Sequence, residues 1–311
     1  MLNLNMMTKK KSIMEKQNKY GYDLTELRAQ YQNYLENPYK RGVESGLTEL
    51  DSIVRLSPSS FAIWTASAGA GKTTFINYYS YIMAKKHNWK TLFISFETPI
   101  YSHLKDFIQM DKGKSCDIQT IDDFDSIESL LENFIFVQTD SISDLDQISR
   151  CIKYYVDNFN INSVVIDPFN YINIDGNMDT NNIGKALRRL AKIPKRYKIL
   201  LNLVAHQRKL QKDEPSGENI LGSVHFKNMA DFIIVMKRDM ENNSVLITAD
   251  KIRDNIDKGM MGETIELYMD TENKHFSSSK PLSKGKDLEL SSSNLLKASQ
   301  KKRKENLVPC A

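Results

Sequence analysis

One glycine-rich segment constrains this chain more than any other part of its sequence. Residues 66–73 read Ala-Ser-Ala-Gly-Ala-Gly-Lys-Thr and follow the phosphate-binding pattern GxxxxGK[ST] everywhere except at Ala66, the first position. An apolar, strand-like run precedes the segment, and apolar residues at helical spacing follow it. Glycines let backbone N–H groups turn toward phosphate oxygens, and the dipole of the following helix adds to that attraction. The segment therefore predicts a nucleotide-binding P-loop.

The residue types in this segment predict separate roles. We expect Lys72 to reach the β- and γ-phosphates of ATP and the Thr73 hydroxyl to hold Mg²⁺. A glycine-rich turn between a strand and a helix is also an ordinary connection, but Gly-Lys-Thr in this context favours the nucleotide site. Further nucleotide contacts are expected from Ala66, Ser67, Ala68, Gly69, Ala70, Gly71 and Thr74.

Strands and helices alternate along residues 42–276. This pattern implies an α/β fold with a mostly parallel central sheet flanked by helices. The last strands follow one another closely, which predicts a short antiparallel extension at the C-terminal end. Strands are expected at 61–66, 91–96, 134–139, 163–166, 199–205, 232–236, 245–249 and 264–269, and helices at 75–87, 145–158 and 183–197.

Two carboxylates stand at the ends of predicted strands. Asp167 ends the apolar run Val164-Val165-Ile166 and is a candidate second Mg²⁺ ligand, acting through water. Glu97 directly follows residues 91–96 and is a candidate for orienting or deprotonating the attacking water. The carboxyl ends of parallel strands gather at one edge of a sheet, so both should lie near Lys72. Taken alone, each could equally be an ordinary carboxylate at a strand end.

The two ends of the chain differ from its middle. The net charge of +4 divides into about +4 for residues 1–41, −5 for the middle and +5 for residues 277–311. Residues 24–35 carry apolar side chains at helical spacing and predict a linker helix that docks on its own domain or on a neighbouring subunit. Residues 277–311 have low hydrophobicity and predict a disordered basic tail. The expected domains are a basic N-terminal segment with a docking helix (1–41), an ATPase motor (42–276) and the tail.

Composition excludes several classes of protein. No apolar run approaches the roughly 18 residues that a membrane-spanning helix needs, and the N-terminus does not resemble a secretory signal. The three cysteines, Cys116, Cys151 and Cys310, form no CxxC pair, so a zinc site or disulfide framework has no support. We therefore expect a cytoplasmic protein with reduced thiols.

These motifs together resemble the RecA-like motor domain of DnaB-family replicative DNA helicases, including the Twinkle and phage primase-helicase branch. The resemblance covers about residues 46–276. Residues 46–51 (Gly-Leu-Thr-Glu-Leu-Asp) resemble the opening motif G-x-x-x-L-D, residues 95–99 (Ser-Phe-Glu-Thr-Pro) resemble S-x-E-x-P, and residues 165–167 match the Walker B strand. In this family the P-loop often begins with Ala, as it does here at Ala66.

The resemblance implies further site residues. His206 corresponds to a γ-phosphate sensor, although Gln207 matches the sensor of the DnaB branch and stays an alternative. Arg238 falls where the family has an arginine against the nucleotide base. Lys251 and Arg253 match a K-x-R motif that reaches the ATP site of the neighbouring subunit. The polar segment 209–224 matches the DNA-binding loop, with candidate contacts at Lys209, Lys212, Gly222 and Ser223; its alternative interpretation is a mobile surface loop.

The function implied is an ATP-dependent, ring-forming helicase that translocates on single-stranded DNA, with ATP and Mg²⁺ as cofactors. The expected partners are single-stranded DNA, further copies of the chain in a hexameric ring, and a separate primase or other replisome proteins, since no primase segment precedes the motor. One alternative is a RecA- or KaiC-like ATPase that assembles on DNA or protein without unwinding. A second is a nucleotide-binding scaffold without enzymatic activity.

Overall fold

The computed structural model describes residues 21–36, 41–67, 69–174, 176–207, 220, 223–253 and 258–280. Ala68, Lys209, Lys212, Gly222 and residues 281–311 of the predicted basic tail lie outside the described residues. No helix in the described ranges is both long enough and apolar enough to cross a bilayer.

Within these residues a single mixed sheet forms the centre of the molecule, in the order β3-β2-β4-β5-β1-β6-β7-β8-β9. All pairs from β3 to β6 are parallel, whereas β7, β8 and β9 continue the sheet in antiparallel pairing. The predicted fold class, with its antiparallel extension, is confirmed. The strands are β1 Ser60–Ala66, β2 Thr91–Ser95, β3 Phe134–Phe136, β4 Ser163–Asp167, β5 Leu200–His206, β6 Phe232–Asp239, β7 Ser244–Ile252, β8 Thr264–Met269 and β9 Phe276–Ser277.

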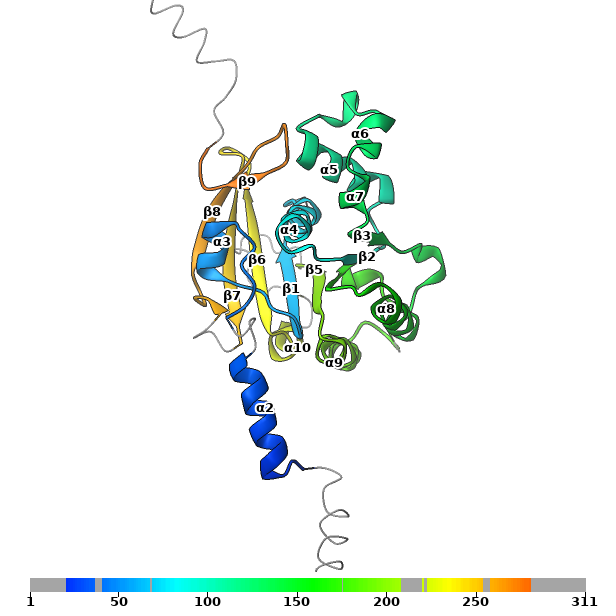
Figure 1. The fold of residues 1–311 in the computed structure, drawn as a ribbon, viewed down its shortest axis with the longest axis vertical. Helices are drawn as coiled ribbons and strands as arrows, with labels where there is room; N and C mark the ends of the chain where they lie inside the picture. The colour runs from blue at the N-terminus through cyan, green and yellow to red at the C-terminus, as the bar shows by residue number, and fades with distance from the viewer. Residues whose placement is uncertain are drawn as a thin grey trace, which may run out of the picture.

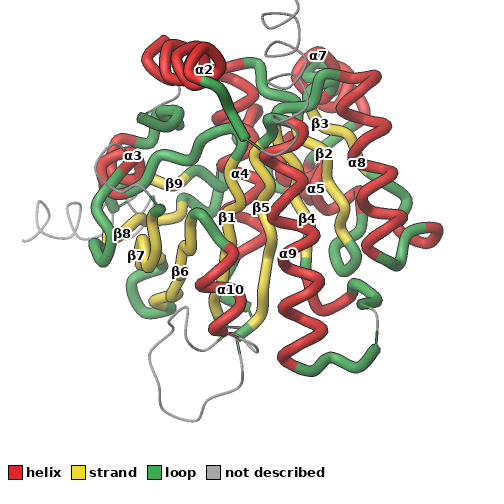
Figure 2. Tube along the Cα trace, turned by 90° about the horizontal axis from the view of Figure 1, so that it is seen from below, coloured by secondary structure: helices red, strands yellow, loops and turns green. Residues whose placement is uncertain are grey.

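Helices cover both faces of the sheet. Figure 1 shows α4 and α5 on one side of the sheet and α8, α9 and α10 on the other, and Figure 2 shows α9 and α10 beside β1, β5 and β4, with α8 nearer β2. The helices are α2 Leu24–Glu36, α3 Thr48–Ile53, α4 Lys72–His87, α5 Ile100–Lys112, α6 Ile121–Asp125, α7 Glu128–Leu131, α8 Leu145–Phe159, α9 Thr180–Tyr197 and α10 Ser223–Met229.

Alternating strand residues build a separate apolar core on each face. On β1, Trp64 belongs to the core under α4, while Phe61 and Ile63 belong to the core under α8 and α9. The Trp64 ring lies 5.7 Å from Phe75 and 5.9 Å from Tyr79, measured between ring centroids, so it packs directly on the helix after the P-loop. This packing fixes the start of α4 relative to β1.

Several predicted boundaries were wrong. Helix α4 begins at Lys72 rather than at residue 75, because Gly71 in the left-handed conformation (φ 85°) is its N-cap. Strand β3 ends at Phe136, whereas β7 runs on to Ile252 and so includes Lys251. Helices α3, α5, α6, α7 and α10 were not predicted, and α10 begins at Ser223, within the segment expected to be a loop.

Helix α2 forms where its apolar spacing predicted a helix. None of its residues is buried, and Leu24 and Tyr31 are 82% and 64% exposed. Figure 1 shows the helix standing away from the body of the molecule. Its apolar side chains therefore dock on nothing in the described part of this chain.

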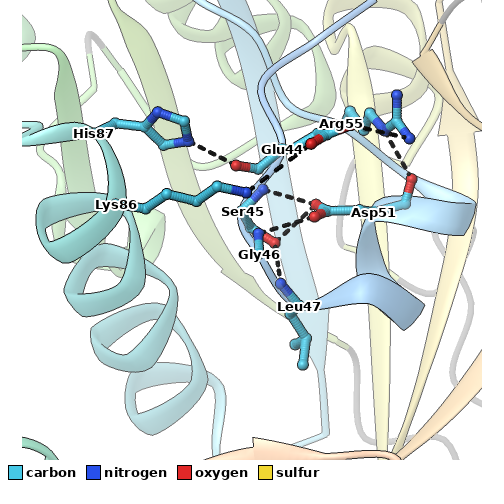
Figure 3. A network of polar contacts seen from close by, with 8 residues as sticks. All are labelled: Glu44, Ser45, Gly46, Leu47, Asp51, Arg55, Lys86 and His87. Atoms are coloured by element: carbon cyan, nitrogen blue, oxygen red, sulfur yellow. Dashed lines mark hydrogen bonds and ion pairs between the residues drawn. The ribbon is translucent and has the colours of Figure 1, made fainter.

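The opening motif forms a loop that leads into α3 and is held by one carboxylate on that helix. Asp51 accepts hydrogen bonds from the backbone N–H groups of Ser45 (2.8 Å) and Gly46 (2.9 Å) and from the Ser45 hydroxyl (2.8 Å), as Figure 3 shows. Gly46 has a φ of 95°, which favours glycine at this position. The short spacing of the motif thus serves to turn the chain before β1.

The same loop contacts the end of α4. His87 Nε2 lies 2.7 Å from the Glu44 carbonyl oxygen, and the Glu44 carboxylate lies 4.0 Å from Lys86 and 3.5 Å from Arg55 (Figure 3). Helix α4 therefore has the P-loop at its first residue and this loop at its last.

Candidate active site

Neighbouring strands carry the predicted site residues to one edge of the sheet. Strands β2, β4, β5 and β1 are neighbours in the sheet. Strand β2 ends just before Glu97, β4 ends at Asp167, β5 ends at His206, and β1 leads into the P-loop. The register places Ser95 beside Asp167 and Ala66 beside His206. The residues expected to meet at the carboxyl ends of the strands do so.

The P-loop holds its lysine inward. Gly69 and Gly71 have φ values of 72° and 85°, and the Lys72 ammonium donates to the carbonyl oxygens of Ala66 (3.2 Å) and Ser67 (2.9 Å). Lys72 is only 6% exposed. Burial lowers the pKa of Lys72 below its ordinary value, and the nearby carboxylates of Asp167 and Glu97 oppose this effect.

Thr73 and Asp167 form the candidate magnesium site. The Thr73 hydroxyl donates to Asp167 Oδ2 at 2.7 Å, joining the first turn of α4 to the end of β4. Asp167 is 4% exposed, and this burial raises the pKa of its carboxyl group, while the hydrogen bond from Thr73 lowers it. A hydroxyl and a carboxylate are the hard oxygen donors that Mg²⁺ prefers, so the side chains fit this ion.

Glu97 and His206 face each other across the end of β4. His206 Nε2 lies 3.5 Å from Glu97 Oε2, and their side chains are 30% and 55% exposed. Both residues border the same cleft as Lys72 and Asp167. Gln207, the alternative sensor, instead pairs with Ile220 through an antiparallel bridge and is not among the residues that border the cleft.

The cleft has a volume of about 570 Å³. Arg238, at the end of β6, reaches into it: its guanidinium donates to Asn243 Oδ1 (3.0 Å) and lies beside Gly71. Ser102 was not predicted as a site residue, although Pro99 in the S-x-E-x-P motif could have indicated a helix start there. The bordering residues are Gly69, Ala70, Gly71, Lys72, Thr73, Thr74, Glu97, Thr98, Pro99, Ser102, Asp167, His206 and Arg238.

Lys251 and Arg253 lie at the opposite edge of the sheet. Strand β7 runs antiparallel to β6, so Lys251 pairs with Ile233 near the start of that strand. The Arg253 guanidinium contacts Asp231 (Nε to Oδ1, 3.2 Å), and Asp231 in turn accepts from the Phe61 N–H at the start of β1 (2.9 Å). The two residues are thus separated from Lys72 of the same chain by the length of β1.

Both basic side chains contact the end of α10. Lys251 Nζ donates to the carbonyl oxygen of Lys227, and Arg253 donates to that of Asn228 at 3.1 Å. Ser223 is the one candidate DNA contact within the described residues. It is the first residue of helix α10 and does not lie in a loop, as had been expected.

Comparison with known proteins identifies relatives of this domain. The model of a family of ATPases described as KaiC matches residues 43–267. A Twinkle homolog protein (chloroplastic/mitochondrial) from Arabidopsis thaliana is 23% identical over 253 residues, which are 74% of this chain and 36% of that protein. The chain therefore corresponds to about a third of that relative.

Solved structures share the fold. One of them, an isolated ATPase domain, has a TM-score of 0.67 and 18% identity, covering 81% of this chain and 97% of that one. A DnaB-like replicative helicase, whose structure addresses its interactions with primase, has a TM-score of 0.64 and 19% identity, covering 83% and 67%. These likenesses confirm the RecA-like motor fold that the motifs predicted.

Proposed function

This chain belongs to the KaiC family of ATPases, and we propose that it is a ring-forming replicative DNA helicase that hydrolyses ATP between subunits and moves along single-stranded DNA. The matches to a Twinkle homolog and to a DnaB-like replicative helicase support this choice within the family. Its cofactors are then ATP and Mg²⁺, and its partners are single-stranded DNA, further copies of the chain and a separate primase or other replisome proteins. The cytoplasmic location stays a prediction.

The separation of Arg253 from the cleft is the observation that carries the proposal. The cleft gathers Lys72, Asp167, Glu97 and His206, but its own Arg253 lies at the far edge of the same sheet. A phosphoryl-transfer site commonly needs an arginine to stabilise the charge of the transition state. A second copy placed head to tail would bring its Arg253 and Lys251 to this cleft.

The residues of the cleft divide the chemistry among them. Lys72 and the P-loop N–H groups hold the phosphates, while Arg238 lies where it can contact the base. Thr73 and Asp167 hold Mg²⁺, which when bound neutralises charge on the phosphate oxygens. Glu97 orients and deprotonates water. His206, 3.5 Å from Glu97 and at the end of β5, contacts the γ-phosphate and senses its presence. Strand β5 leads to residues 209–224, which hold the candidate DNA contacts.

Two inactive variants test whether the site is shared. Lys72→Ala removes the phosphate lysine and Arg253→Ala removes the arginine, so each variant alone should lose ATPase activity. In a 1:1 mixture, about one quarter of the interfaces combine an intact Lys72 with an intact Arg253, so about a quarter of the wild-type rate should return. Arg188→Ala, which removes an exposed arginine on α9, is the matched control and should keep full activity.

A forked duplex with ATP and Mg²⁺ tests the helicase itself. The wild-type chain should unwind the fork, and the mixture should recover both ATPase and unwinding. A mixture no more active than its components would refute hydrolysis in trans. Intact ATPase and ring assembly without unwinding would refute the helicase assignment.

A KaiC- or RecA-like ATPase that assembles without unwinding is the second candidate, because the family match is to KaiC itself. Electron microscopy with an ATP analogue and single-stranded DNA separates the two. Closed rings support the helicase, whereas open filaments support a recombinase-like assembly.

A further inference from the structure

A chain of buried polar side chains runs behind the cleft. Ser95 Oγ lies 2.9 Å from His103 Nε2, and His103 Nδ1 lies 2.9 Å from Asn77 Oδ1. Asn77 Nδ2 then donates to Asp106 Oδ2 at 3.0 Å, and Lys274 donates to the other oxygen of Asp106. His103 and Asn77 are each 1% exposed, so this network lies inside the protein rather than on its surface.

The chemistry of the partners fixes the direction of each hydrogen bond. An ionised Asp106 can only accept, so Asn77 turns its NH₂ group to Asp106 and its oxygen to His103. That oxygen needs a donor, so His103 carries its proton on Nδ1 and accepts the Ser95 hydroxyl proton at Nε2. Burial lowers the pKa of His103 to about 4, with Asp106 opposing the shift, so the ring is neutral at ordinary pH. His103 therefore holds Ser95 and Asn77 by hydrogen bonds and does not transfer a proton.

The Ser95–His103 contact in this network holds together the two ends of residues 96–102, the segment that carries Glu97. Ser95 is the last residue of β2, and His103 lies in the first turn of α5, so their contact joins the two ends of residues 96–102. The Phe96 N–H also donates to the Asp167 carbonyl oxygen (2.8 Å), which ties the segment to β4. The position of Glu97 thus depends on contacts made on both sides of it.

Asn77 connects the Ser95–His103 contact to α4, the helix that follows the P-loop. It lies on α4 four residues after Thr73, on the same face of the helix. His103 therefore bridges the helix that carries Lys72 and Thr73 to the segment that carries Glu97.

We propose that His103 is a positioning residue for ATP hydrolysis, which clasps residues 96–102 and sets Glu97 at a fixed place relative to Thr73. The inference rests on the proposed role of Glu97. The ring also packs against both Phe93 and Phe136, with centroids 5.2 and 5.5 Å away, where an apolar side chain would fill the space without needing polar partners. The polar ring at this apolar site is accounted for by the clasp.

Replacing His103 tests the clasp by kinetics. His103→Leu fills the site with an apolar side chain but removes both hydrogen bonds, and His103→Gln keeps one donor and one acceptor. A displacement of about 1 Å in a catalytic group can slow a reaction on the order of 100-fold. We expect kcat for ATP to fall about 10- to 100-fold in H103L, with KM and the affinity for a fluorescent ADP analogue unchanged, and to recover in part in H103Q.

A double-variant cycle separates the clasp from a general packing effect. If His103 acts through Glu97, then Glu97→Gln should slow hydrolysis strongly, and adding H103L to it should cause little further loss. Losses that multiply in the double variant, or a rise in KM alone, would overturn the clasp and leave the role of Glu97 standing. A full rate in E97Q would overturn both the role of Glu97 and the inference that rests on it.

Ser95→Ala is the second variant, in case H103L fails to fold. It removes the hydroxyl from the other end of the clasp without disturbing the packing of the ring, and it should lower kcat in the same direction. Thermal unfolding and native mass confirm that each variant is folded and assembled at the assay temperature. A folded S95A with wild-type kcat would contradict the clasp.

Discussion

Acidification from pH 7 to pH 5 should cost the folded chain about 2 kcal/mol of stability through His103 alone. The pKa of this group is about 4 in the fold, because burial disfavours the charged ring, and its ordinary value is 6.5. Between these values the unfolded chain binds a proton that the folded chain does not, so stability falls as the pH falls through this window. Evaluating both states at pH 7 and pH 5 gives a difference of about 2 kcal/mol, and moving the folded pKa by one unit changes it by only a few tenths.

Urea unfolding at the two pH values measures this term. Other groups also titrate, so the quantity to compare is the pH-dependent loss in the wild type minus the loss in His103→Gln, which has no ring to protonate. Asp106, held by Lys274 and Asn77, is the charged side chain facing the ring and is present in both proteins. Equal losses in both proteins would show that the folded chain accepts a proton at His103, which would refute the neutral, hydrogen-bonded ring.

Three further substitutions, two of them paired with a control variant, test the fold. Phe75→Ala should lower the free energy of unfolding by about 3–5 kcal/mol, because this fully buried ring packs on Trp64 and Phe276; exposed Tyr31→Ala should change it by less than about 0.5 kcal/mol, both in urea. Asp51→Ala should cost about 1–3 kcal/mol and speed hydrogen exchange at the Gly46 amide, because two backbone N–H groups lose their acceptor. Gly259→Ala should cost on the order of 3 kcal/mol in thermal unfolding, since an added Cβ would lie 2.1 Å from the Ile53 carbonyl oxygen. Gly262→Ala, also at positive φ but with no atom within 4 Å, is its control and should cost about 1–2 kcal/mol.

The carboxyl edge of the sheet could be predicted from the sequence because each strand there reads as a short apolar run. Asp167 and Glu97 end or follow such runs, and parallel pairing brings the ends together whatever the connecting segments do. The strand order that makes β2, β4, β5 and β1 neighbours has no such local signal and was not predicted. The convergence of Lys72, Asp167 and Glu97 was thus predictable, whereas the 3.5 Å contact of His206 with Glu97 was not.

Polar residues at buried positions made helix α5 and the end of strand β7 hard to predict from the sequence. Helix α5 buries His103, Asp106 and Gln109 beside its apolar residues, so its core-facing side does not read as an apolar stripe. Each of these side chains is satisfied by a residue far along the chain, such as Asn77 or Lys274, which local spacing cannot reveal. Strand β7 was predicted too short for a related reason, because Asp250 and Lys251 look like the start of a loop although Lys251 pairs with β6.

The reversed direction of β7 also bears on the shape of the proposed assembly. It places Arg253 beside the start of β1 and the P-loop at the other end, about 23 Å away for seven strand residues. If the site is shared as proposed, each contact joins the Arg253 end of one copy to the P-loop end of the next, which are two different surfaces of the chain. Repeating such a head-to-tail contact gives a ring where the rotation closes and an open filament where it does not. Such an assembly has a direction, because every copy donates its arginine on one side and receives one on the other.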